Sequence, residues 1–225
     1  MVQGDLDRVR LLAPLDGRER TALAGRCSWR RYRAGEMVLS REAIDRDVLF
    51  LIEGRLKVVN YAASGREIAY AVLEPGAHVG ELAALDGQPR SASVEALDPC
   101  LVASLPPGPF HDLLHAHPEI AVGMLKNLAR IIRQSDERIA ELSVLTAMQR
   151  IYRELHRLAR STGNGAVAIA PMPTQEEIAA LVGTTRETVA RALGQLAKAG
   201  TVRRRGRELL ILKPELLESL AQLEG

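Results

Sequence analysis

Residues 174–191 contain the pattern that most restricts the folds open to this chain of 225 residues. Two short amphipathic runs lie on either side of Gly183, a residue suited to a tight turn. The second run begins with Arg186 and Glu187. This layout predicts a helix-turn-helix, in which the second helix enters the major groove of double-stranded DNA.

Two threonine–glutamate pairs predict where these helices begin. Thr174 precedes Glu177 by three residues, and Thr184 precedes Glu187 by three, as in a capping box. The inner faces of the two helices are predicted to consist of small and aliphatic residues, namely Ile178, Ala179, Leu181, Val182, Val189, Ala192, Leu193 and Leu196.

The outward-facing polar residues of this segment suit DNA. Arg186, Glu187 and Arg191 are expected to reach base edges, because arginine can bind guanine O6 and N7 and glutamate can accept from cytosine N4. Phosphate contacts are expected from threonines and from a basic two-stranded wing over residues 202–212, through Thr174, Thr185, Thr188, Arg205 and Arg207. In residues 171–213, eight Lys and Arg oppose four Glu, which favours an anionic partner. The alternative is that Glu187 only caps its helix and that the two arginines form a solvated face.

The first half of the chain has a different pattern. Short β-favouring runs at residues 37–39, 48–52, 56–59 and 68–73 alternate with turn signals at Gly54, Gly65 and Gly76. Short helices are expected within residues 5–27 and 110–116. This spacing of short strands predicts a sandwich or a barrel-like β-roll, so the fold class is α+β.

A long helix is predicted to begin near Pro118. Its apolar positions recur in steps of three and four, which is the a/d heptad pattern of helices that share a seam. The predicted seam, read as a parallel dimer interface, consists of Leu125, Leu128, Ile132, Ser135, Ile139 and Leu142. Three segments follow from these patterns: a β-roll with flanking helices over 1–117, a dimerisation helix over 118–145, and a winged helix-turn-helix over 146–225.

Residues 80–92 contain a second motif, which suits a small phosphate ligand. Gly80 allows close backbone approach, Arg90 can form a fork with a phosphate, and Ser91 can donate from its hydroxyl and amide. Glu81 repels phosphate but can accept from the 2′-hydroxyl of a sugar. The composition therefore predicts a cyclic nucleotide rather than a bare phosphate. The alternative is that Glu81 and Arg90 simply pair with each other.

Both motifs resemble one known family. Residues 185–191 resemble the recognition helix of the cyclic-AMP receptor protein (CRP/FNR) family of bacterial regulators, and residues 80–92, with Leu82 inside them, resemble its phosphate-binding cassette. The resemblance covers nearly the whole chain. It implies a jelly-roll-like cyclic-nucleotide-binding β-roll, a homodimer, cAMP as allosteric ligand, a palindromic DNA site and RNA polymerase as a further partner. It also implies that Arg186, Glu187 and Arg191 read a TGTGA-type half-site and that Thr174 contacts a phosphate.

Two positions depart from the family pattern. Val79 stands where an aromatic residue often precedes the glycine. Ser135 and Asp136 match a Thr-Ser pair of the family's long helix that contacts adenine. A carboxylate accepts from the N6 amine of adenine but equally from N1–H and N2–H₂ of guanine, so cGMP remains an alternative ligand.

Other classes of function find less support. The two cysteines form no CxxC pair and no zinc spacing, so no metal is expected. A run of about eighteen apolar residues and a secretory h-region are both missing, which predicts a cytoplasmic protein without a membrane partner. The sequence contains neither a Ser/His/Asp set nor a Walker loop, so no enzyme is expected. The remaining alternatives are an effector-independent member, a haem or gas sensor using His78, Cys27 or Cys100, and a regulatory subunit that binds a kinase.

Overall fold

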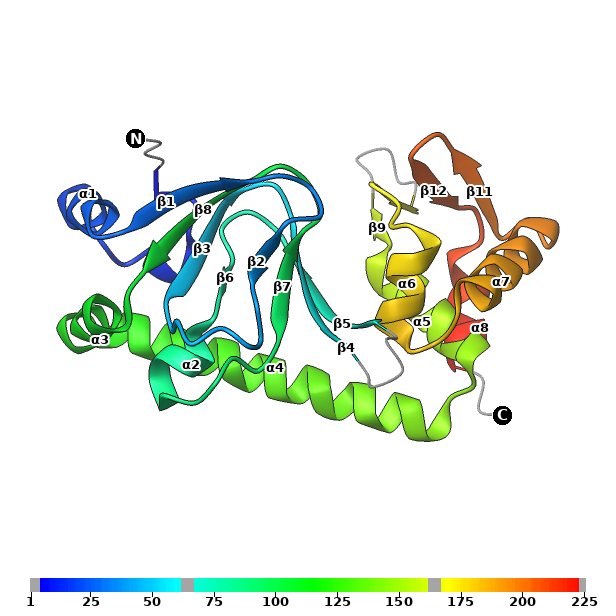
Figure 1. The fold of residues 1–225 in the computed structure, drawn as a ribbon. Helices are drawn as coiled ribbons and strands as arrows, with labels where there is room; N and C mark the ends of the chain where they lie inside the picture. The colour runs from blue at the N-terminus through cyan, green and yellow to red at the C-terminus, as the bar shows by residue number, and fades with distance from the viewer. Residues whose placement is uncertain (1–4, 62–66, 162–166, 223–225) are drawn as a thin grey trace. The chain divides into compact units, whose positions relative to one another are not determined.

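The computed structural model describes residues 5–61, 67–161 and 167–222 (Figure 1). The chain divides into two compact units, Met1–Ile132 and Arg133–Gly225. The division falls inside the long helix α4, which begins at Pro118 as predicted and ends at Val144. The turn predicted at Gly65 lies outside the described residues.

The first unit is a β-roll made of two four-stranded antiparallel sheets (Figure 1). One sheet has the order β1-β8-β3-β6 and the other β2-β7-β4-β5. The strands are β1 (Ser28–Tyr32), β2 (Met37–Leu39), β3 (Val48–Glu53), β4 (Leu56–Tyr61), β5 (Glu67–Leu73), β6 (His78–Val79), β7 (Ser93–Ala96) and β8 (Cys100–Leu105). The accompanying helices are η1 (Arg10–Leu12), α1 (Gly17–Gly25), α2 (Glu81–Asp86) and α3 (Pro107–Ala116). The predicted α+β class and β-roll are confirmed.

Strand β3 is buried on both faces, which explains its unbroken apolar sequence. Leu49 and Leu51 pack into a core that both sheets share, with residues such as Val38 and Val94. On the other face, Phe50 packs with Phe110 of α3 and with residues of η1, α1 and α4. A strand that is covered on both sides needs apolar residues at successive positions rather than alternate ones.

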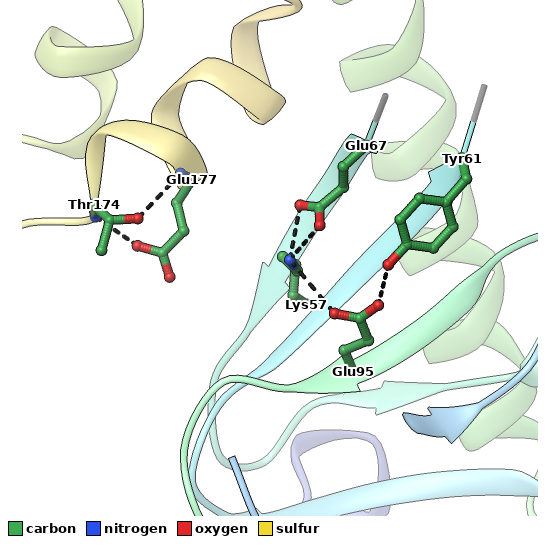
Figure 2. A network of polar contacts seen from close by, with 6 residues as sticks. All are labelled: Lys57, Tyr61, Glu67, Glu95, Thr174 and Glu177. Atoms are coloured by element: carbon green, nitrogen blue, oxygen red, sulfur yellow. Dashed lines mark hydrogen bonds and ion pairs between the residues drawn. The ribbon is translucent and has the colours of Figure 1, made fainter. Parts of the chain in front are cut away.

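The outer face of the second sheet carries a cross-strand ion-pair network (Figure 2). Lys57 on β4 lies 2.7 Å from Glu67 on β5 and 3.6 Å from Glu95 on β7. The Tyr61 hydroxyl donates to Glu95, and this hydrogen bond raises the pKa of Tyr61 to about 12. Opposite charges on neighbouring strands stabilise a sheet, so these contacts support the register of β4 with β5 and β7.

The second unit places helices around a four-stranded antiparallel sheet of order β11-β12-β10-β9. Its elements are α5 (Ala147–Leu158), β9 (Arg160–Ser161), β10 (Val167–Ile169), α6 (Gln175–Val182), α7 (Arg186–Lys198), β11 (Val202–Arg205), β12 (Glu208–Ile211) and α8 (Pro214–Gln222). The predicted inner faces of α6 and α7 lie in the core, with Ile178 and Val189 completely buried and Leu181 and Leu193 partly buried. β11 and β12 form the predicted wing.

One of the two predicted capping boxes is wrong. Thr174 caps α6, and Glu177 donates its backbone N–H to the Thr174 hydroxyl at 3.1 Å while its carboxylate accepts from the Thr174 N–H (Figure 2). In α7 the N-cap is Thr185, not Thr184, and its hydroxyl accepts from the N–H of Thr188 at 3.3 Å. Thr184 instead donates its N–H to Ala179 at the end of α6, so the second helix begins one residue later.

Candidate functional site

Gly80 occupies a conformation that favours glycine. Its φ is +88°, and it precedes the first residue of α2. A Cβ at this position would lie 2.6 Å from Nη1 of Arg90 and 2.8 Å from the carbonyl oxygen of Asp47. The missing side chain therefore lets the arginine cross the backbone at the start of the helix.

Arg90 is buried beside this turn, with 3% of its surface exposed. Its Nη1 donates to the carbonyl of Gly80 at 2.9 Å, and its Nη2 forms an ion pair with Asp45. Its Nε is buried and has no hydrogen-bond partner in the described part of the chain. A buried guanidinium with an unsatisfied donor can bind an anion at little further desolvation cost.

Glu81 is buried next to the arginine, with 7% of its surface exposed. Its Oε2 likewise lacks a hydrogen-bond partner among the residues that the structure describes. Burial raises the pKa of this carboxyl, and its own backbone N–H and the charge of Arg90 partly offset the rise. Arg90 forms its ion pair with Asp45 rather than with Glu81, so the alternative that Glu81 and Arg90 pair with each other finds no support in the structure.

The other predicted ligand contacts are more exposed. Leu82 on α2 is 42% exposed, and Ser91 follows Arg90 as an exposed residue. Ser135 and Asp136 lie on the part of α4 that belongs to the second unit, and both are exposed. The sequence reasoning missed Asp45, which lies in the β2–β3 loop and shows no local pattern that could have revealed it.

Two of the residues named for a haem alternative, His78 and Cys100, are engaged in other contacts, and the third, Cys27, is largely buried. His78 is mostly buried, its Nε2 lies 3.2 Å from Nδ2 of Asn127, and burial together with Arg10 and Arg130 lowers its pKa to about 4. Burial raises the pKa of Cys27 to about 12. The thiol of Cys100 is buried and lies within hydrogen-bond distance of the Arg55 and Asp98 carbonyls.

The predicted base-reading residues lie together on the first turns of α7 and are exposed. Arg186 forms an exposed ion pair with Glu176 at 3.3 Å. Hydrogen bonds from its own backbone N–H and from the Thr185 hydroxyl lower the pKa of Glu187, so this carboxylate also helps to cap the helix. An exposed pair of this kind is worth little in water, and Arg186 can exchange Glu176 for a base edge.

The wing carries its arginines on the surface. Arg205 is paired with Glu208 at 2.8 Å, and its side chain is 71% exposed. Arg207 is exposed at the turn between β11 and β12, and its carbonyl accepts from Met172 at 2.8 Å. Exposed cations on a wing suit phosphate contacts.

Helix α4 carries large apolar side chains on its surface. Leu125, Ile132, Ile139 and Leu142 of the predicted seam are 65%, 60%, 62% and 51% exposed. Leu128 differs, because it packs against the core of the first unit. A stripe of exposed aliphatic residues at heptad spacing is typical of a helix that packs against another.

Arg150 joins the end of α4 to the turn between α6 and α7, a role the sequence reasoning missed. It donates to Leu145 at 2.7 Å, to Val182 at 2.9 Å and to Gly183 at 3.4 Å, all through backbone carbonyls. A Cβ on Gly183 would lie 3.4 Å from Leu142. The segment over residues 142–146 therefore contacts the helix-turn-helix within the second unit.

The fold and these residues define a two-part class of protein: a β-roll that buries an arginine and a carboxylate side by side, and a winged helix-turn-helix with exposed arginines on its second helix. Residues 29–117 match the cyclic nucleotide-binding domain, and residues 149–220 match the Crp-like helix-turn-helix domain. The helix-turn-helix match includes the basic residues 171–213, which a regulatory subunit that binds a kinase would not require. No helix in the described residues is long and apolar enough to cross a membrane.

Similar proteins agree with both matches. The CRP-like cAMP-activated global transcriptional regulator of Mycobacterium tuberculosis is 33% identical over 175 residues, which cover 76% of this chain and 78% of that protein. The cyclic AMP receptor protein of Thermus thermophilus is 30% identical over 192 residues, covering 85% and 87%. The structure of a CooA mutant from Carboxydothermus hydrogenoformans matches with a TM-score of 0.81 over 99% of this chain and 98% of that one, and at 20% identity it shows the fold alone. The chain belongs to the CRP/FNR family of transcription regulators.

Proposed function

We propose that this protein is a homodimeric, cyclic-nucleotide-responsive regulator that binds a palindromic DNA site, with cAMP as its effector. The observation that carries the ligand proposal is the pair of unsatisfied buried atoms, Oε2 of Glu81 and Nε of Arg90. One is an acceptor and the other a donor, and both belong to the cassette after Gly80. A ribose 3′,5′-cyclic phosphate supplies a hydroxyl for the first and an anionic oxygen for the second.

The proposed roles in the pocket follow from the same chemistry. Arg90 binds the phosphate, assisted by Ser91, and Glu81 accepts from the 2′-hydroxyl. Gly80 and Leu82 line the approach to the sugar, and Ser135 with Asp136 on α4 contacts the base. A purine amine such as N6 of adenine can donate to Asp136.

Fewer observations bear on which purine the ligand carries. Two relatives are named for activation by cAMP or reception of cyclic AMP, which favours cAMP. The carboxylate of Asp136 favours cGMP as the alternative, since it can accept from both N1–H and N2–H₂ of guanine.

DNA binding is proposed to require two copies of the chain. The exposed stripe on α4 pairs with that of a second copy, and each copy offers α7 to one half-site of a palindrome. The two recognition helices must then lie about 34 Å apart, one turn of DNA. The segment over residues 142–146 is the proposed hinge, and the ligand acts by favouring the arrangement of this hinge that meets the spacing. RNA polymerase is the expected partner at the promoter.

Calorimetry with cAMP and cGMP on the full-length protein tests the ligand proposal, with Arg90→Ala as the comparison. We expect one of the two nucleotides to bind the wild type and neither to bind the variant with comparable affinity. Titration of a duplex containing two TGTGA-type half-sites then tests gating, and affinity should rise when the nucleotide is added. Failure of both nucleotides to bind, or to change duplex affinity, would remove the sensor proposal.

A visible absorption spectrum of the purified protein tests the haem alternative. An intense absorption band near 400 nm that is lost on removing the pigment would contradict the proposed effector. The contacts of His78 and Cys100 and the raised pKa of Cys27 described above give this alternative no support.

A further inference from the structure

The carboxylate of Asp45 lies beside the buried guanidinium of Arg90, in the place where an anionic ligand would bind. The two side chains form an ion pair, although they are 45 residues apart in sequence. The side chain of Arg90 is 2% exposed, whereas that of Asp45 is 52% exposed. The pair therefore has one member fixed in the protein and one at the surface.

The two members differ in how easily they can leave. Arg90 is held by Gly80 at 2.9 Å, and the backbone at Gly80 leaves room for it. Asp45 lies in the loop between β2 and β3, beside Ile44, which is 97% exposed. The carboxylate of Asp45 is already half in water, so turning fully into solvent requires little change in its hydration. The guanidinium, once buried, must keep an anion nearby.

We infer that Asp45 competes with the ligand phosphate for Arg90 and so sets the affinity of the pocket. This inference rests on the proposed function, since it names the competitor at the same arginine. When the phosphate binds, its anionic oxygen replaces the Asp45 carboxylate at Nη2, and Asp45 moves to solvent. The number of anions around Arg90 stays the same in both cases. Without this exchange the site would hold two carboxylates and a phosphate against one guanidinium.

The test uses the full-length protein with Asp45→Asn and a matched control. Asparagine keeps the size of the side chain and removes the charge that competes. Glu42→Gln makes the same charge change three residues earlier in the same loop, at an exposed side chain. Calorimetry with cAMP and cGMP on all three proteins should show at least about fivefold tighter binding for Asp45→Asn, because a pair with one buried member is worth no less than a fully exposed one, and no change for Glu42→Gln. General damage to the pocket would lower the affinity instead.

The outcomes separate this inference from the proposed function. If the wild type binds a nucleotide and Asp45→Asn binds it equally or more weakly, the proposed competition by Asp45 is wrong, whereas the proposed nucleotide site is retained. An equal gain in Glu42→Gln would also overturn it, because the effect would then be general electrostatics. If neither wild type nor Asp45→Asn binds either nucleotide, both proposals fall.

A second measurement does not depend on the variant folding. Hydrogen–deuterium exchange of the wild type, with and without the nucleotide that binds, reports on the loop over residues 40–47. Release of Asp45 should raise exchange in this loop while exchange in residues 80–91 falls. Equal or slower exchange in the loop on ligand binding would contradict the displacement of Asp45.

Discussion

Arg90 donates from Nη1 to the carbonyl of Gly80 at 2.9 Å, so the arginine of the cassette is held by the glycine that begins it. The nine-residue step from Glu81 to Arg90 thus brings a carboxylate and a guanidinium to the same end of α2. Each leaves one buried atom unsatisfied among the described residues. This arrangement is the physical basis of the pocket predictions below.

Gly80→Ala should destabilise the first unit and weaken ligand binding. The φ of +88° and the 2.6 Å approach of Nη1 to a Cβ leave no strain-free position for alanine. We expect a loss of about 1–3 kcal/mol in the free energy of unfolding, measured by urea denaturation. The control is Gly108→Ala, where a Cβ would meet nothing within 4 Å. That change should stay within about 0.5 kcal/mol, and an equal loss at both positions would contradict the argument.

Removing the 2′-hydroxyl of the ligand should weaken binding only when Glu81 is present. The wild type should bind 2′-deoxy-cAMP more weakly than cAMP by about 1.5–3 kcal/mol, the value of a hydrogen bond to a charged group. Glu81→Ala should bind the two compounds almost equally, because the partner of the hydroxyl is gone. Calorimetry of the four combinations gives the coupling energy. Additive effects would show that the hydroxyl and Glu81 do not meet.

Replacing an arginine of α7 and replacing an arginine of the wing should change DNA binding in different ways. Arg191→Ala should lower affinity for a specific duplex by about 1–3 kcal/mol and relax the preference at one base pair. Arg207→Ala should weaken specific and random duplexes alike and reduce the dependence of affinity on salt. Fluorescence anisotropy over a salt series distinguishes the two. Lys198→Ala, at the far end of α7, is the control and should leave sequence preference unchanged.

Charge placed on the exposed stripe of α4 should prevent pairing of two chains. Ile132 is 60% exposed, and Ile132→Glu would bring two carboxylates together across a parallel seam. We expect the dissociation constant of the dimer to rise at least about tenfold, equivalent to 1.4 kcal/mol, by analytical ultracentrifugation. Ala140→Glu adds the same charge at an exposed position of α4 outside the predicted seam. An equal rise in the dissociation constant for Ala140→Glu would contradict the predicted position of the seam.

Acid should destabilise the first unit through His78. Its pKa is about 4 in the folded protein, below the ordinary 6.5, because of burial and the charges of Arg10 and Arg130. As pH falls from 6.5, the unfolded chain therefore binds the proton first. The neutral imidazole contributes its full stability above pH 6.5 and loses about 3 kcal/mol of it as pH drops to 4. Urea denaturation at a series of pH values measures this slope.

His78→Gln should flatten that slope, since glutamine does not titrate. His115→Gln is the matched control, because His115 is exposed on α3 and its replacement should leave the slope as it is. A slope that survives in His78→Gln would assign the acid sensitivity to other groups.

Short-range patterns in the sequence sufficed for much of the fold. The Thr174–Glu177 box, the glycine at 183 and the wing around Gly206 are local signals, because caps and turns depend on neighbouring residues. The unbroken apolar run over residues 48–52 also indicated strand β3. By contrast, β1 contains Trp29 between polar residues and follows no clear alternation, and its pairing with β8 depends on residues about seventy positions away.

The cassette residues Gly80, Glu81 and Arg90 could be chosen from residue chemistry and spacing alone. Only the tertiary structure decided which atoms in it are satisfied and which are not, because that depends on what else the fold brings to the site. Asp45 reaches Arg90 from a loop, and Arg150 reaches Leu145 and Gly183 from α5, through contacts that no local pattern encodes. Local sequence determines where helices and turns begin, whereas long-range packing determines which charges meet.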